Sequence, residues 1–204
     1  MKRAGTLLGS VLLVISLATA AFALGEPDKM VTYKVTYHTS AGTSVLFTSY
    51  SVVATAEGGY WLQRTTAMSP DAEPLSITQT LLDASTHQPQ RYIMYRPAKM
   101  NQPASVVDLP LAKMGKDEIL PMTITGTATE QLQLEAGTFD TQKRTDGEVT
   151  FWGAADVPVL GIAKVETPEW IMEAFSIQDG VIDLLPEKPA SGGTVYLEEE
   201  SVPE

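Results

Sequence analysis

The stretch Val31-Thr32-Tyr33-Lys34-Val35-Thr36-Tyr37-His38 decides the fold, because apolar and polar side chains alternate in it residue by residue. Side chains of a β-strand point alternately to the two sides of a sheet, whereas a helix repeats every 3.6 residues. The four apolar residues from Val31 to Tyr37 therefore share one face of a strand, and the polar residues share the other. The same two-residue period continues through most of the chain. We therefore expect a mainly all-β protein with at most one or two short helices.

Turn residues separate the alternating segments and predict an antiparallel meander. Gly58-Gly59 and Asp146-Gly147 supply the positive φ that tight hairpins need. The predicted strands cover residues 31–38, 44–55, 60–67, 75–82, 90–95, 122–129, 131–135, 138–144, 148–152, 162–166, 170–178 and 181–185. A flat sheet of this size would leave exposed edges, so we expect a strongly curved sheet, a half-barrel.

Two segments do not show this two-residue alternation. Residues 96–118 contain Pro97, Pro103 and Pro110, which predicts an irregular excursion with one short helix. The concave side of the half-barrel has to be filled either by such a segment or by a ligand. Residues 24–186 should form one domain, and residues 187–204 an acidic tail that is disordered because it holds too little apolar surface.

The first residues have the order of a cleavable secretory signal peptide, residues 1–23. Met1-Lys2-Arg3 is a basic start, residues 7–17 are mostly apolar, and Ala21-Phe22-Ala23 has the small-residue pattern that signal peptidase cleaves. We expect cleavage after Ala23 and export to the periplasm or the medium, with no stable membrane span afterwards. The alternative is a retained anchor, because residues 6–24 are mostly apolar and about 20 such residues cross a bilayer.

The charge and the cysteine content of the chain limit the classes of partner and of chemistry that are expected for it. The chain carries 14 basic and 25 acidic side chains and no cysteine. Loss of Lys2 and Arg3 with the signal peptide leaves 12 against 25, a net charge of −13. Such an acidic field repels nucleic acid and anionic membrane surfaces, or in the alternative interpretation serves solubility alone. The absence of cysteine excludes disulfides, thiol catalysis, cysteine-based metal sites and a lipid anchor on an N-terminal cysteine.

No residue pattern predicts catalysis, a cofactor or a metal. His38 and His87 are the only histidines, and their spacing matches no zinc motif. The chain has neither a G-x-S-x-G elbow nor a glycine-rich phosphate loop that leads into a helix. Only Met94 and Met100 are methionines close in sequence, which favours core packing over a Cu(I) site. We expect a non-enzymatic protein without cofactor or metal, and a hydrolase whose catalytic groups assemble in space is a minor alternative.

Several motifs carry a family resemblance over residues 75–178. They are Leu82-Asp83-Ala84-Ser85-Thr86 before Pro89 and Tyr92, Glu135-Ala136-Gly137-Thr138-Phe139, Phe151-Trp152, Asp156-Val157-Pro158 and Gly161-Ile162-Ala163-Lys164-Val165-Glu166. Together they resemble uncharacterised exported bacterial β-proteins, in which an AGTF hairpin precedes a tryptophan strand and a VP-x-x-G-x-x-K crossover. Those families resemble the periplasmic lipoprotein carrier and its outer-membrane receptor, whose sheet curls around a hydrophobic cavity. The covering helix and the lid-holding arginine of the carriers have no counterpart here, so the resemblance implies the fold and not lipoprotein transfer.

Large aromatic side chains are the candidates for the wall of a ligand cavity. Rings with polar tips suit the rim of a pocket for an amphiphile. Trp152 is the first choice because it alternates with Phe151, so that one of the two faces the concavity. The predicted wall consists of Trp152, Trp61, Tyr33, Tyr92 and Trp170.

These observations favour a non-enzymatic periplasmic protein that binds or carries a lipid or another hydrophobic ligand in a half-barrel. The alternative is a protein-interaction module of a cell-envelope assembly, which acts through an exposed sheet edge or through the acidic tail.

Overall fold

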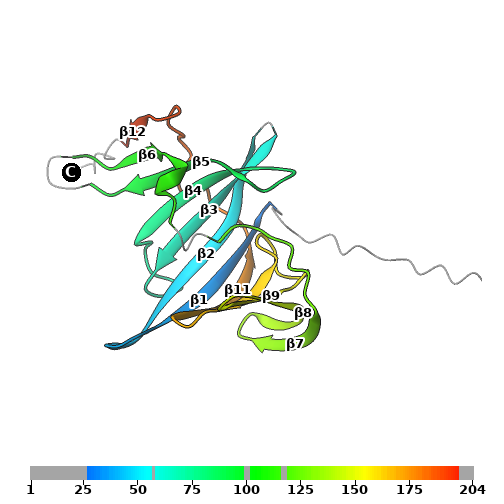
Figure 1. Ribbon diagram of the computed structural model, residues 1–204. Coiled ribbons are helices and arrows are strands. Elements are labelled where there is room, and N and C mark those ends of the chain that lie inside the picture. Colours follow the sequence, from blue (N-terminus) through cyan, green and yellow to red (C-terminus); the bar gives the residue numbers. More distant parts are fainter. Residues whose placement is uncertain (1–26, 57, 99–101, 116–118, 198–204) are drawn as a thin grey trace, which may run out of the picture.

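The computed structural model describes residues 27–56, 58–98, 102–115 and 119–197 and confirms the all-β prediction (Figure 1). The expected signal peptide lies outside these residues. Twelve strands form one open antiparallel sheet in the order β12-β6-β5-β4-β3-β2-β1-β11-β10-β9-β8-β7, and the sheet bends strongly between its two ends without closing into a barrel. The helical structure in the described part is the 3₁₀ turn η1 (Leu111–Lys113), and none of it is long and apolar enough to cross a bilayer.

The sheet consists of two meanders joined side by side. The first contains β1 (Lys29–Thr39), β2 (Gly42–Ala56), β3 (Gly59–Ala67), β4 (Ser76–Asp83), β5 (Pro89–Arg96) and β6 (Ser105–Leu109). The second contains β7 (Ala128–Leu134), β8 (Gly137–Asp146), β9 (Val149–Gly153), β10 (Ile162–Glu166) and β11 (Trp170–Asp179). The first strand, β1, pairs with β11, and the short β12 (Thr194–Tyr196) pairs with β6.

The alternation in β1 buries one face, as predicted. Val31 and Tyr33 are fully buried and Val35 nearly so. Residues opposite each other in paired strands lie on the same side of a sheet. Tyr50 of β2 is opposite Val31, and Met172 of β11 is opposite Val35. These side chains form the floor of a first core, on the side of the sheet that we call the first face.

The connection from β6 to β7 covers the first face. β6 and β7 lie near opposite ends of the sheet, so residues 110–127 have to lead from one end to the other. Ile119, Leu120 and Met122 pack against the first core. A second cover comes from residues 154–160, where Val157 and Leu160 are fully buried. Tyr33 Oη also donates a hydrogen bond of 2.8 Å to the carbonyl of Ile162, the first residue of β10, directly after this cover.

Two predictions for this part of the chain were wrong. Residues 122–129 were expected as a strand, but only 128 and 129 belong to one, because 122–127 lie over the core and the Met122 amide donates to the Leu160 carbonyl at 3.2 Å. Residues 96–118 were expected to be irregular, yet they contain β6, whose backbone pairs with β5 and β12. The prolines flank this strand and leave its amides free to pair.

The chain after β11 crosses the opposite side of the sheet, the second face, and covers a second core. Trp61, Ile93 and Val106 form the floor of this core, and Leu185 and Leu197 pack onto it. The predicted strand at residues 181–185 was wrong, because these residues lie over the sheet and pair with no strand. The predicted disordered tail was wrong for residues 187–197, because β12 extends the sheet there. Residues 198–204 lie outside the described residues.

Buried polar side chains fasten this C-terminal segment, residues 181–197, to the second face. Gln63 Nε2 donates to the Ile182 carbonyl at 3.0 Å, and Gln63 Oε1 accepts from the Leu184 amide at 2.9 Å. Arg91 donates to the Pro189 carbonyl at 2.7 Å while it holds the Asp108 carboxylate. Polar contacts of this kind favour one docking position over others that would leave these groups unpaired.

Candidate functional site

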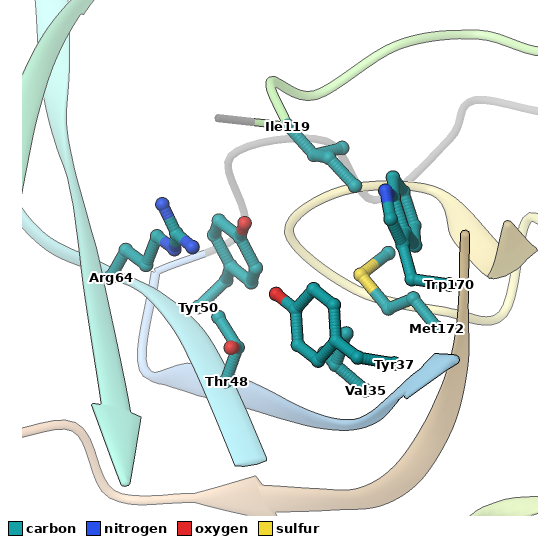
Figure 2. A pocket seen from close by; sticks show the side chains of 8 residues that line it. All are labelled: Val35, Tyr37, Thr48, Tyr50, Arg64, Ile119, Trp170 and Met172. Carbon is teal, nitrogen blue, oxygen red and sulfur yellow. The ribbon is translucent and has the colours of Figure 1, made fainter. Parts of the chain in front are cut away.

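The concave side of the sheet has almost no free space where the first core is covered. The pocket in Figure 2 measures about 20 Å³, room for about one water molecule. Side chains from β1, β2, β3 and β11 line it together with Ile119, which faces Trp170 and Met172 (Figure 2). In the described part of the chain, the segments that cover the first core therefore fill the concavity.

The five aromatic residues predicted as a cavity wall are spread over the molecule. Trp170 lines the small pocket of Figure 2, and Tyr33 is buried in the first core. Trp61 belongs to the second core, on the other side of the sheet. Tyr92 is buried on β5.

Trp152 lies on the opposite side of its strand from Phe151, as the alternation predicted, and Phe151 is the one that packs on the first core. The Trp152 ring has Lys143 Nζ 4.7 Å and Lys164 Nζ 5.2 Å from its centroid. Its indole nitrogen donates to the Glu130 carboxylate. Cation–π contacts of this kind contribute about 0.5–2 kcal/mol. Trp152 thus links β7, β8, β9 and β10, where it packs among charged groups.

A hollow of about 880 Å³ lies instead at the β12 end of the sheet. We call it the end groove. It is lined by Leu75, Ser76, Met94, Tyr95, Arg96, Pro97, Gln102, Pro103, Ser105, Val107, Thr194 and Tyr196. Small-molecule sites usually measure about 300–1,000 Å³ and are mostly apolar with a few polar groups, which matches this hollow.

Strand register positions the floor of the end groove. Met94 of β5 is opposite Val107 of β6, which is opposite Thr194 of β12. In the next cross-strand row, Arg96 is opposite Ser105, which is opposite Tyr196. These rows lie on the first face of the sheet, beyond the part that the first core covers. Three chain segments far apart in sequence therefore combine in one surface.

The end groove exposes apolar surface beside a single cation. Leu75 is 62% exposed and Tyr196 66% exposed. Arg96 is the only charged side chain among its described lining residues. The protein has a net charge of −11, so a groove whose single charge is positive differs from the molecule as a whole. An apolar surface next to one guanidinium is complementary to an amphiphile with an acidic head group.

Sequence reasoning missed the end groove because two of its strands were not predicted. β6 was placed in an irregular segment, and β12 in the expected tail. A signal for β12 is present in Gly192-Gly193-Thr194-Val195-Tyr196, a glycine turn followed by three β-favouring residues. Its partner strand could not be identified from sequence, because β6 and β12 are separated by 84 residues between Leu109 and Thr194.

The titratable groups with altered properties have structural explanations. Hydrogen bonds from the Ser85 hydroxyl and from the Thr86 and Ser85 amides hold the pKa of Asp83 well below its usual value. They form the turn between β4 and β5. The Tyr60 hydroxyl lies 2.7 Å from His87 Nδ1, so this histidine faces a phenol rather than a serine or a carboxylate. No group of three or more potential metal ligands occurs among the residues that the structure describes.

No family model matches the sequence, and no curated protein matches it either. Two solved structures show a likeness. One, described as a "putative lipoprotein" from Parabacteroides distasonis ATCC 8503, is 13% identical over 77% of this chain and 98% of that chain, with a TM-score of 0.40. The other, a "putative exported protein with YmcC-like fold" from Bacteroides fragilis NCTC 9343, is 12% identical over 78% of this chain and 99% of that chain, with a TM-score of 0.37. At these TM-scores, neither likeness carries an argument about function.

Proposed function

We propose that this chain is an exported, non-enzymatic binding protein of the cell envelope that holds an anionic amphiphile in the end groove. The ligand class is an acyl chain with an acidic head group. The observation that carries this proposal is the volume of about 880 Å³ in combination with its lining, which is apolar except for Arg96 and a few hydroxyl and amide groups.

The end groove replaces the half-barrel interior as the proposed ligand site. A pocket of about 20 Å³ holds no acyl chain, whereas the end groove is large enough for a drug-sized ligand. The acyl chain would lie on Met94 and Val107 and against the ring of Tyr196. The head group would reach the Arg96 guanidinium. Burial of apolar surface drives such binding, and the charge pair sets the orientation of the ligand.

Export is part of the proposal and depends on residues 1–23. Their basic start, apolar core and A-x-A end are typical of a secretory signal peptide. A cysteine-free and acidic chain suits an oxidising envelope, because it needs no disulfide and stays soluble.

Calorimetric titration of the processed protein with dodecanoate and with dodecanol tests the site. We expect dodecanoate to bind more tightly. The Arg96→Gln variant should lose about ten- to a hundredfold in affinity for dodecanoate, because a charge-assisted hydrogen bond is worth about 1.5–3 kcal/mol, and should keep its affinity for dodecanol. Val107→Glu should abolish binding of both, because it places a carboxylate on the apolar floor.

Ile182→Glu is the matched control, since Ile182 is 73% exposed and does not line the end groove. It adds the same charge to the surface and should leave binding unchanged. Equal effects of Val107→Glu and Ile182→Glu, in variants with unchanged circular dichroism, would contradict the proposal. So would the absence of dodecanoate binding by the wild-type protein.

The second candidate function is that of an interaction module, and the open sheet favours it. Among the described residues, the outer strands β7 and β12 each pair with a strand on one side only, so their other edges are open to a partner strand there. Cross-linking to envelope proteins should then depend on these edges. Because β12 belongs to the fold, a truncation that tests the acidic tail has to begin at residue 198. A Gln131→Pro variant tests β7, since proline removes a backbone donor.

A further inference from the structure

The second face of the sheet carries a floor of hydroxyl groups across four neighbouring strands. Ser176 of β11 is opposite Thr32 of β1, and Thr32 is opposite Ser49 of β2. Ser49 is in turn opposite Thr65 of β3. Neighbouring strands lie 4.7–4.9 Å apart, so the four hydroxyls form a row about 14 Å long. We call this the hydroxyl row.

The hydroxyl row lies in a hollow of about 210 Å³. The loop between β3 and β4 forms one wall with Pro70, Ala72 and Pro74, and Leu184 of the C-terminal segment lies at another side. Phe47 lines one end and packs edge-to-face on Phe175, with ring centroids 5.1 Å apart. An aromatic face at the end of a polar floor offers both hydrogen bonds and a flat apolar contact.

The floor keeps much of its hydrogen-bonding capacity for a ligand. Thr32 Oγ1 and Ser49 Oγ lie 2.8 Å apart and share one proton, so one of the two still has a proton to donate. The hydroxyls of Thr65 and Ser176 bond to no other side chain in the described part of the chain, and both residues are half-buried. Hydroxyls that both donate and accept are the natural partners of other hydroxyls.

We propose that the hydroxyl row binds a neutral oligosaccharide, with sugar hydroxyls on the row and a sugar ring against Phe47. This is a second binding site, separate from the end groove and independent of the function proposed there. It lies on the other face of the sheet, because the end groove contains residues of the first face.

Other ligand classes fit this hollow less well. The only charged lining residue among those described is Asp71, which repels anions and offers a cation one carboxylate. An apolar ligand would strip water from hydroxyls without replacing their hydrogen bonds, which costs free energy. A peptide strand would find no free backbone, because β11, β1, β2 and β3 are each paired on both sides.

Titration of the processed protein with cellohexaose, chitohexaose and maltohexaose, followed by calorimetry and by amide NMR shifts, tests the site. We expect at least one of these neutral oligosaccharides to bind and to shift the amides of β1, β2 and β3. Thr65→Val replaces a hydroxyl by a methyl group of the same shape and should weaken binding about fivefold. Ser176→Ala should do the same.

Thr66→Val is the matched control, because Thr66 is the next residue of β3 and points to the opposite side of the sheet. It should leave affinity unchanged. The Val107→Glu variant of the end groove should also bind the oligosaccharide normally, which separates the two sites. The proposal is overturned if none of the three oligosaccharides binds, or if Thr66→Val weakens binding as much as Thr65→Val does.

Discussion

The Gln79 side-chain amide donates a hydrogen bond of 2.6 Å to the Asp183 carboxylate, and this contact joins the middle of the sheet to the segment that crosses its second face. Gln79 is fully buried. The same carboxylate accepts from Lys188 Nζ at 2.8 Å and from the Leu185 amide at 2.9 Å. Asp183 is therefore the centre of the polar contacts that hold the C-terminal segment.

Asp183→Ala should lower the free energy of unfolding by about 1–3 kcal/mol, because the buried Gln79 amide, the Lys188 ammonium and the Leu185 amide each lose an acceptor. Urea unfolding followed by fluorescence measures this. Asp179→Ala is the control, since Asp179 is 76% exposed in its pair with Lys29 and a surface pair contributes about 0–1 kcal/mol. Equal losses in the two variants would contradict the assigned role.

The contribution of Asp183 should disappear in acid. Burial by itself raises the pKa of Asp183, but hydrogen bonds from Lys188, Gln79 and the Leu185 amide outweigh burial and lower it. A carboxyl whose pKa is depressed by folding stabilises the protein above its unfolded pKa of about 3.9 and loses this effect as the pH falls through the folded value. The stability difference between wild type and Asp183→Ala should be constant above about pH 5 and shrink below pH 4. A difference that grows in acid would refute this.

Leu185→Ala should lower the free energy of unfolding by about 2–5 kcal/mol, because this side chain is 1% exposed in the second core. Its neighbour Leu184 is 40% exposed, so Leu184→Ala should cost less than about 1 kcal/mol. A glutamate-specific protease should also cut after the exposed Glu187 faster in Leu185→Ala, since the C-terminal segment then detaches more often. Similar cleavage rates in the two variants would show that Leu185 does not anchor this segment.

Two tyrosines should ionise late in an alkaline titration. Burial raises the pKa of Tyr60 to about 12, and burial together with Tyr50 raises that of Tyr33 well above its usual value. An acid whose pKa is raised by folding stabilises the protein below its unfolded pKa of about 10 and loses this effect as the pH rises through the folded value. In a titration followed by ultraviolet absorbance, the Tyr60→Phe variant should lack one of the tyrosine ionisation steps that occur at high pH in the wild-type protein. Stability should fall between about pH 10 and 12 less steeply in this variant.

Gly126→Ala should destabilise the protein by about 1–3 kcal/mol through overpacking. A methyl group there would collide with the backbone of Lys143 in β8, which cannot move without disturbing its pairing. Thr127→Ala changes the exposed neighbouring residue and should be nearly neutral. Thermal unfolding of both variants measures the difference. An unchanged midpoint for Gly126→Ala would show that residues 119–127 do not lie closely on β8.

Hairpins between neighbouring segments were predictable from sequence. Strands β1 to β5 and β8 to β11 lie where alternation and glycine turns placed them, because each depends on residues within about 20 positions. Strand β6 was missed because it is only five residues long and has prolines on both sides. Residues 122–127 were mistaken for a strand. In this segment, Ile124 is buried against the sheet that lies beneath it. Apolar and polar residues alternate in the same way in a strand and in a loop that covers a sheet, so the pattern does not distinguish the two.

Alternation of side chains along the chain by itself determined that this protein is an antiparallel sheet and which side of each strand is apolar. Only the tertiary structure decided that β1 pairs with β11, that the two chain crossings cover opposite faces, and that Met94, Val107 and Tyr196 meet in one groove. The reason is physical: the direction of a side chain depends on the local backbone, whereas the partner of a strand edge is chosen by the burial of surfaces distant in sequence.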